Sequence, residues 1–239
     1  MEPKPNDPKT VETYTASHWL RLILIYLLIP LILFGFAWDI GWWQAWGFTL
    51  LILLAGVGGR MWAEWRHPGL LMERAKFATV EGVKPWDKIL APLMAISISF
   101  PLVIVAGLDH HYGWSPAFPL WSNLLGFLLI AFGYGFAVWA LAENRYFSGV
   151  VRIQADRGHV VCDTGPYRIV RHPGYLGNIL PLIGIVLAFG SAWTLIPAFA
   201  ALVIALIRTG LEDRTLQEEL PGYRDYAQRV RYRLFPGIY

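Results

Sequence analysis

"YLGNILPLIGIVLAFGSAWTLIPAFAALVIALI", residues 175–207, is an apolar run of 33 residues interrupted by Gly190 and Ser191. A transmembrane helix needs about 20 apolar residues, so this run is too long for one crossing and suits two helices that turn back at the Gly-Ser pair. Its first half, 175–189, extends about 22 Å at 1.5 Å per residue and is short for a hydrocarbon core of about 30 Å. The run therefore predicts a helical hairpin whose two ends lie on the same side of a membrane.

Four more apolar runs precede this hairpin and are long enough to cross a bilayer. They cover residues 19–38, 43–62, 89–108 and 120–141. Of the 239 residues, 56% are hydrophobic and only 15% are charged, against about 25% charged residues in ordinary soluble domains. The sequence thus predicts an all-α polytopic membrane protein with about six hydrophobic helices, the last two forming a hairpin.

Lysine and arginine are confined to alternate connections between these helices. The connecting segments 39–42, 109–119 and 190–191 contain neither residue. Positive charges mark cytoplasmic loops, so we expect both termini and the loops 63–88 and 142–174 on the cytoplasmic side.

The chain is expected to form one membrane domain with three parts. Residues 1–16 have mixed charge and three prolines and are expected to be a disordered cytoplasmic arm. Residues 17–142 are expected to hold the first four helices. Residues 143–239 are expected to hold a polar loop, the hairpin and a C-terminal cytoplasmic segment. Within the loop 63–88, leucines and Phe77 alternate with charges, which predicts an amphipathic segment lying on the membrane surface.

Several classes of site are disfavoured by what the sequence lacks. Cys162 is the single cysteine, so there is no internal disulfide and no Cys-x-x-Cys metal pair. A di-iron site needs several clustered histidines, but His110 and His111 stand alone on the opposite face, and we predict no metal ligands. The net charge of +3 comes with no nucleic-acid-binding motif. A glycine-rich turn after a strand, which many soluble cofactor-binding enzymes use, is also absent.

Polar residues gather at the two ends of the hairpin. "GPYRIVRHPGY", residues 165–175, precedes it and "RTGLEDRTL", 208–216, follows it, so the two stretches are expected to meet in space. Prolines and glycines in the first stretch force irregular backbone, which is tolerated at membrane depth only when buried in protein or lining a cavity. We therefore predict a polar cavity lined by His172, Arg208 and Glu212.

The paired stretches also resemble a known superfamily, that of isoprenylcysteine carboxyl methyltransferases and phospholipid methyltransferases. Its members carry G-x-Y-x-x-x-R-H-P-x-Y-x-G before the last hairpin and R-x-x-x-E-E-x-x-L after it. Here the second motif is Arg208-x-x-x-Glu212-Asp213-x-x-Leu216, with Asp213 in place of the second glutamate. The resemblance covers about residues 143–236, and the first 140 residues share only the helical layout.

The resemblance implies a membrane enzyme that binds S-adenosylmethionine and transfers its methyl group to a lipophilic acceptor. The family's substrate-orienting arginine corresponds to Arg208, and Glu212 is assigned to the same catalytic group. The residues that correspond to the family's cofactor contacts are Gln154, His159, Val160, Val161, Cys162, Tyr167, His172, Pro173, Gly174, Tyr175 and Glu212.

The acceptor remains open between several chemical classes. A guanidinium can hold a carboxylate bidentately, so Arg208 favours a lipophilic carboxylate such as a prenylated cysteine. A phospholipid amine and a thiol are the alternatives within the family. Membrane sterol reductases share a related R-H-x-x-Y-x-G element and use NADPH, and a non-enzymatic scaffold or transporter is a further alternative. The expected partners are membrane lipids and the lipophilic substrate, with no nucleic acid; the sequence does not indicate an oligomeric state.

Overall fold

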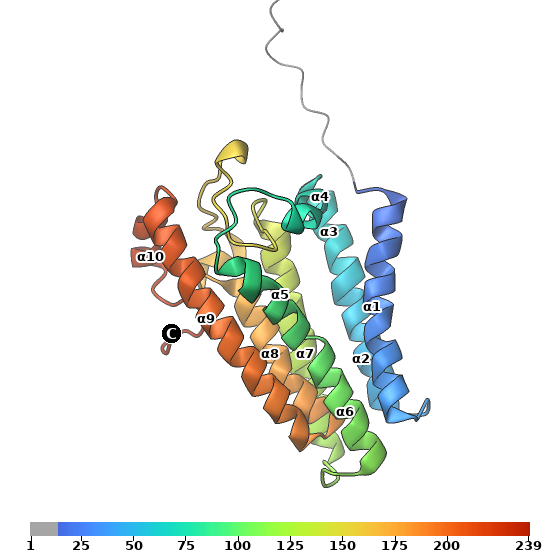
Figure 1. Ribbon diagram of the computed structural model, residues 1–239. Helices are drawn as coiled ribbons and strands as arrows, with labels where there is room; N and C mark the ends of the chain where they lie inside the picture. Colours follow the sequence, from blue (N-terminus) through green and yellow to red (C-terminus); the bar gives the residue numbers. More distant parts are fainter. Residues whose placement is uncertain (1–13) are drawn as a thin grey trace, which may run out of the picture.

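The computed structural model describes residues 14–239, and the secondary structure in this part of the chain is helical, without strands. The helices run side by side as an elongated bundle (Figure 1). This confirms the all-helical fold predicted from the sequence. The predicted arm, 1–16, lies outside the described residues except for its last three positions, and the first helix begins at Ala16.

Five helical segments are long and apolar enough to cross a membrane. They are α1 (Ala16–Ala37), then Trp43–Arg66, Asp87–Tyr112, α7 (Leu120–Glu143) and Ala192–Glu219. The second consists of α2 (Trp43–Leu53), a π-helical turn η1 (Leu54–Gly58) and α3 (Gly59–Arg66). The third is broken between α5 (Asp87–Ser97) and α6 (Phe100–Tyr112). With a shorter apolar helix, they make the predicted multi-pass membrane protein.

The shorter helix, α8 (Pro173–Phe189), and the following α9 (Leu195–Glu219) form the predicted hairpin. Between them, Gly190 ends α8 with φ +65°, a left-handed conformation that glycine adopts without steric cost, and a 3-10 turn η5 (Ala192–Thr194) leads into α9. At 1.5 Å per residue, α8 is about 25 Å long.

The helix packed most extensively on α8 is α7, along most of its length, rather than its hairpin partner α9. Glycines make this close approach possible. A Cβ atom on Gly126 would lie 2.3 Å from the backbone nitrogen of Ala188, and one on Gly177 would lie 2.5 Å from that of Ala137. Side chains at these positions would push the helices apart. Gly177 therefore allows the start of α8 to lie against the last part of α7, and Gly126 does the same for the opposite ends of the two helices.

Short helices and loops gather at one end of the bundle, the upper end in Figure 1. They are α4 (Leu70–Ala75), η2 (Lys76–Ala78), η3 (Ala155–Arg157), η4 (Gly165–Arg168) and α10 (Tyr223–Arg229). The loop 63–88 differs in part from the surface segment expected from its sequence. Leu70 and Leu71 are buried, at 1% and 3% exposure, so α4 packs into the protein, whereas Phe77 is exposed.

Candidate functional site

Arg208 projects from α9 into a buried ion pair with Asp87, the first residue of α5. Its Nε donates to Asp87 Oδ1 at 2.6 Å, and one terminal nitrogen, Nη2, donates to Asp87 Oδ2 at 3.0 Å. Nη2 also donates to the carbonyl of Gly149 at 3.0 Å, and Asp87 Oδ2 accepts the Val151 backbone N–H at 2.6 Å. The pair therefore joins α5, α9 and the segment that follows α7. The Arg208 guanidinium, predicted to hold the carboxylate of an acceptor, therefore holds the carboxylate of Asp87 instead.

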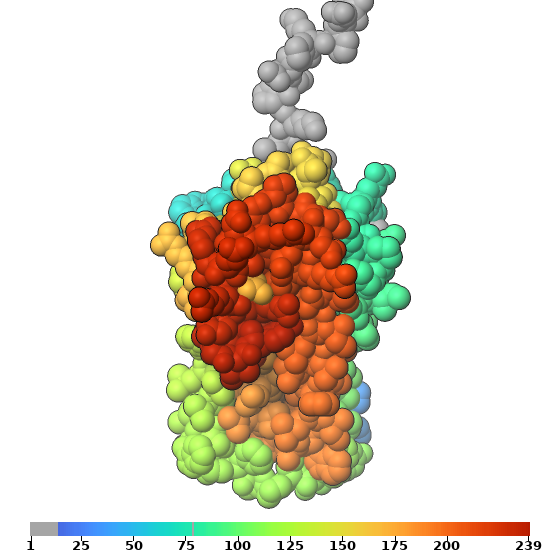
Figure 2. Space-filling view, turned by 90° about the vertical axis from the view of Figure 1, so that its left-hand side faces the viewer, coloured from blue at the N-terminus to red at the C-terminus, as the bar shows by residue number. Residues whose placement is uncertain are grey.

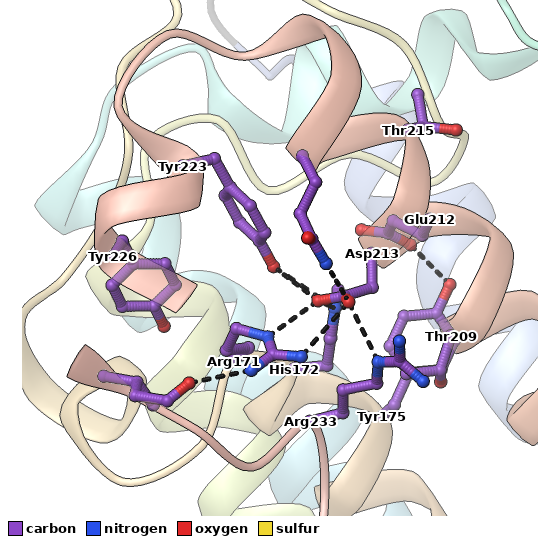
Figure 3. Close-up of polar contacts among 12 residues, drawn as sticks. Arg171, His172, Tyr175, Thr209, Glu212, Asp213, Thr215, Tyr223, Tyr226 and Arg233 are labelled. Carbon is purple, nitrogen blue, oxygen red and sulfur yellow. Dashed lines mark hydrogen bonds and ion pairs between the residues drawn. The ribbon is translucent and has the colours of Figure 1, made fainter. Parts of the chain in front are cut away.

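Tyr175 and Glu212 meet across the hairpin, as their positions at its two ends predict. The Tyr175 hydroxyl donates to Glu212 Oε2 at 2.6 Å (Figure 3), and the Arg208 guanidinium lies 5.5 Å from the centre of the Tyr175 ring. Oε1 of Glu212 accepts no hydrogen bond from any residue in the described part of the chain. One carboxylate oxygen is therefore open to a ligand that carries hydrogen-bond donors.

Asp213, next to Glu212, is fully buried and is the centre of a larger polar network (Figure 3). Arg171 donates to both of its oxygens, at 2.7 and 3.1 Å, and His172 Nε2 lies 3.1 Å from Oδ1. The other donors to this carboxylate are Gln217, Tyr223 and Arg233, at 2.7, 3.1 and 2.9 Å. His172, predicted to contact the cofactor, is thus engaged with a carboxylate of the protein.

The same network fastens the C-terminal segment to the residues before α8. The backbone N–H groups of Arg171 and His172 donate to the carbonyls of Tyr232 and Arg233, at 3.0 and 2.9 Å. Figure 2 shows this face from outside: the end of α9, α10 and the C-terminal residues surround a small hollow, with atoms of an earlier, yellow-orange part of the chain at its bottom. The buried polar network therefore lies behind a rim made by the C-terminal segment.

Gln154 and His159 are placed together, in the loop around η3. Gln154 is buried, and its side-chain amide donates to the Tyr146 carbonyl at 2.7 Å. The His159 ring lies 4.7 Å from the Tyr146 ring, and His159 Nδ1 accepts the Gln154 backbone N–H at 3.3 Å. Loss of solvent, with the positive charges of Arg152 and Arg157, lowers the pKa of His159 to about 4. The His159 ring is therefore neutral at physiological pH.

The next predicted contacts, Val160 to Cys162 and Tyr167, are not all turned toward one space. Val160 is 60% exposed, whereas Val161 and Cys162 pack against Tyr167 in a cluster with tyrosines of α10. Burial raises the pKa of the Cys162 thiol and raises that of Tyr167 well above its ordinary value. Both groups are therefore protonated at neutral pH.

A cavity of about 180 Å³ lies inside the bundle. Its walls are mostly apolar and come from α1, the second span, α6, α7 and α8, and two arginines, Arg60 and Arg74, line it as well. A second, open groove of about 360 Å³ lies between the second span and α7. The groove shares Ala55, Tyr134 and Val138 with the cavity. The cavity is therefore next to an opening on the flank of the bundle.

Two residues connect this cavity with the first turn of α8. Asn178 lines the cavity, and its side-chain amide donates to the Gly174 carbonyl at 2.7 Å. Phe147 also lines the cavity, and a Cβ on Gly174 would lie 2.7 Å from the Phe147 ring. The predicted cofactor element, Pro173 to Tyr175, therefore begins at the wall of the apolar cavity.

Sequence reasoning missed several of these residues. Asp87 stands at the start of an apolar run, where an acidic residue is ordinary at a helix N-terminus, so its pairing with Arg208 had no local signal. Arg60 and Arg74 belong to the basic loop region that indicated the cytoplasmic side. Phe147 and Asn178 are single residues in stretches without a motif.

The fold and the site define a multi-pass helical membrane protein with a polar centre at one end of its last hairpin, next to an intramembrane cavity. Residues 121–221 match the family model described as phospholipid methyltransferase. A cobalt-zinc-cadmium resistance protein of Cupriavidus metallidurans is 34% identical over 161 residues, 57% of this chain and 71% of that protein. The chain belongs to the superfamily of isoprenylcysteine carboxyl methyltransferases and phospholipid methyltransferases.

Two other relatives match over shorter stretches. The Delta(14)-sterol reductase of Mus musculus is 30% identical over 96 residues, 38% of this chain and 23% of that protein. A nickel-cobalt-cadmium resistance protein of Alcaligenes xylosoxydans xylosoxydans is 39% identical over 70 residues, 28% of this chain and 32% of that protein. Within residues 14–239, no three His, Cys, Asp or Glu side chains are grouped so as to hold a metal ion.

Proposed function

We propose that this protein transfers a methyl group from S-adenosylmethionine to a lipophilic acceptor, at the cytoplasmic face of a membrane. One observation carries the proposal: the start of α8, where the family binds its methyl donor, forms the wall of an apolar cavity through Phe147 and Asn178. The polar site for the methyl donor and the apolar cavity for the acceptor would therefore lie next to each other. The cytoplasmic orientation rests on the distribution of Lys and Arg, whose loops lie at the same end as the site.

The residues at the start of α8 suit this cofactor. Oε1 of Glu212 is an open acceptor for its ammonium or hydroxyl groups, and Tyr175, fixed by its bond to Oε2, presents a ring to pack on adenine. S-adenosylmethionine supplies a methyl group on a sulfonium sulfur, which keeps the electrons of the broken bond while a lone pair of the acceptor forms the new one. Such a reaction depends on positioning and on exclusion of water more than on acid–base groups.

The protein's own residues supply that positioning. Glu212 and Tyr175 hold the donor side, and Phe147, which lies against Gly174 and lines the cavity, stands where the donor side and the cavity adjoin. A lipophilic acceptor reaches the cavity sideways from the membrane, through the groove that shares Ala55 and Tyr134 with it. Arg208, bonded to Asp87, orders the segment around Gly149 that continues from Phe147.

The test is methyl transfer by the purified protein, with tritiated-methyl S-adenosylmethionine and lipids extracted from native membranes. We expect labelled lipid, and alkali lability separates a methyl ester from a methylated amine or thiol. Glu212→Gln should weaken binding of S-adenosylmethionine by about 10- to 100-fold in calorimetric titration, because a charged hydrogen-bond partner contributes about 1.5–3 kcal/mol. Glu218→Gln is the matched control, because Glu218 lies on the same helix in an exposed pair with Arg214.

The sterol reductase match motivates one alternative, a reductase that uses NADPH. The same preparation is therefore assayed for NADPH oxidation with sterol substrates. Oxidation of NADPH without any transfer of label would refute the methyltransferase proposal in favour of the reductase. If wild type and Glu212→Gln bind S-adenosylmethionine with equal affinity, the proposed cofactor site at the start of α8 is refuted.

A further inference from the structure

Arg60 and Arg74 bring two positive charges to the wall of the apolar cavity. Arg60 Nη1 donates to the Gly56 carbonyl at 3.0 Å and to the Tyr26 hydroxyl, and its guanidinium lies 5.1 Å from the centre of the Tyr26 ring. Arg74 Nη1 donates to the Phe147 carbonyl at 3.3 Å, and its guanidinium lies 5.0 Å from the centre of that ring. Both side chains are thus held in place by uncharged groups.

The carboxylates closest in sequence to these arginines, and Asp87 at the site, are already engaged. Glu64, one turn after Arg60, accepts the backbone N–H groups of Gly69 and Leu71 at 2.7 and 2.8 Å. Glu73 pairs with Arg152, and Asp87 pairs with Arg208. Among the described residues, neither Arg60 nor Arg74 forms an ion pair with a carboxylate.

The electrostatic cost of this arrangement falls mainly on Arg74. Loss of solvent, followed by repulsion from Arg60, lowers the pKa of the Arg74 guanidinium to about 9. Arg60 and Arg74 are both partly buried, and a cation withdrawn from solvent is ordinarily paired, because its desolvation is costly without a counter-charge. An anion placed in this part of the cavity would relieve both the desolvation and the mutual repulsion.

The free edges of the two guanidinium groups suit an anion with two oxygens. Each arginine makes its hydrogen bonds through Nη1, so Nε and Nη2 donate to no residue within 14–239. That pair of nitrogens forms the fork that binds a carboxylate or phosphate bidentately. In Arg208 the same two nitrogens are occupied by Asp87. The available fork therefore belongs to the cavity arginines rather than to Arg208.

Apart from Tyr26, Ser99, Tyr134 and Asn178, the other residues that line the cavity are apolar. Its walls include Phe48, Ile52, Val103, Leu182 and Ile185, from the second span, α6 and α8. A ligand that satisfies both regions has an anionic group at one end and a hydrocarbon chain at the other. We propose that Arg74, with Arg60, binds the anionic group of an amphiphile whose chain fills this cavity. The proposal deepens the proposed function, on which it rests, and assigns recognition of the acceptor's anion to Arg74 and Arg60 instead of Arg208.

The experiment measures binding directly and needs no methyl donor. The purified full chain, in a neutral detergent, is mixed with octanoic acid carrying a diazirine at its methyl end, a chain whose size matches the cavity of about 180 Å³, then irradiated and digested for mass spectrometry. We expect labelled peptides from the cavity wall around Val103 and Ile185, at least tenfold less labelling with the matching alcohol, and a loss of about tenfold or more in Arg74→Gln. Such losses correspond to about 1.4 kcal/mol or more, within the range for charged hydrogen bonds.

Two variants guard against a general loss of structure. Arg74→Lys keeps the charge but not the fork and should retain partial labelling, whereas Arg21→Gln removes an exposed arginine of α1 and should label like wild type. Thermal melting in the same detergent verifies that each variant is folded. Lysophosphatidic acid with the same diazirine serves as the phosphate arm, and labelling that depends on Arg74 in this arm also supports the anion subsite and assigns it to phosphate.

Equal labelling by the acid and the alcohol would overturn the proposal, and so would labelling that is unchanged in a folded Arg74→Gln variant. Peptides labelled only on the lipid-facing surface of α1 would overturn it as well. Because these measurements contain no S-adenosylmethionine, their failure leaves the methyl-transfer proposal standing. Conversely, specific acid binding together with no methyl transfer would keep the anion subsite and refute the proposed function.

Discussion

Replacing Asp213 with Asn removes one negative charge and converts one carboxylate oxygen into an amide donor. The carboxylate accepts six hydrogen bonds, three at each oxygen. An amide nitrogen at Oδ2 would face two guanidinium groups and the Gln217 amide nitrogen, none of which can accept a hydrogen bond. At Oδ1 it would face His172 and Tyr223, which can accept, but also Arg171 Nε. In either orientation Arg171 loses one of its two bonds and its counter-charge.

The magnitude follows from burial. Arg171 is 7% exposed and Asp213 is fully buried, and removing one partner of such a pair costs about 3–5 kcal/mol. Arg233 is 35% exposed, so the loss of its pair adds about 1 kcal/mol or less. We therefore expect Asp213→Asn to lower the free energy of unfolding by about 3–5 kcal/mol and to loosen the C-terminal segment fastened by the same arginines.

The matched control is the neighbouring Glu212→Gln. Its carboxylate accepts one hydrogen bond, from Tyr175, which an amide oxygen can also accept, so the expected loss of stability is about 1 kcal/mol or less. Unfolding is followed by circular dichroism during titration with sodium dodecyl sulfate in mixed micelles, and trypsin cleavage after Arg231 and Arg233 reports release of the C-terminal segment. An Asp213→Asn variant as stable as wild type, or one that loses only cofactor binding, would refute this reasoning.

Three further predictions concern other parts of the site. Asp87→Asn and Arg208→Lys should each lower the methyl-transfer rate more than the affinity for the cofactor. A double-mutant cycle should show a coupling energy of about 0.5–3 kcal/mol between the two residues, and additive effects would show that they act independently. Gly135 lines the open groove, and Gly135→Leu should lower kcat/KM for a lipophilic acceptor without weakening cofactor binding. Gly35 is equally free of neighbours but lies outside the groove, so Gly35→Leu should leave kcat/KM unchanged. His159 has a folded pKa of about 4, below its ordinary 6.5, so the stability it contributes is present above pH 6.5 and lost as the pH falls toward 4; an NMR titration midpoint near 6.5 would contradict this.

The membrane helices were predictable because their signal is local. Apolar length and flanking charge do not depend on tertiary contacts, and each predicted run coincides, to within one residue, with one of the observed helical segments or the hairpin. The turn at Gly190 followed from the same pattern, and the meeting of Tyr175 with Glu212 followed from the hairpin geometry. Once the two ends of a hairpin are known, the residues at those ends can be expected to lie close together.

The partners that complete the site were not predictable in this way. Asp87 and Arg208 are 121 positions apart and lie on helices whose order of packing the sequence does not specify. The close contact of α7 with α8 depends on glycines such as Gly126, which in a membrane helix are common enough to carry little information alone. The cavity is formed by side chains from several helices, so no single stretch carries its pattern.

The distribution of buried charge gives these separate observations one physical explanation. Asp87 neutralises Arg208, and Asp213 neutralises Arg171, so each carboxylate ties a residue beside or within the hairpin to another part of the chain. The irregular backbone between α7 and α8 is held between these two pairs, as it must be at the edge of a membrane where unpaired groups are costly. Arg60 and Arg74, in the described part of the chain, have no such partner and face a cavity instead. The paired arginines fasten the hairpin to its surroundings, and Arg60 and Arg74 are the two that the proposed anion subsite uses.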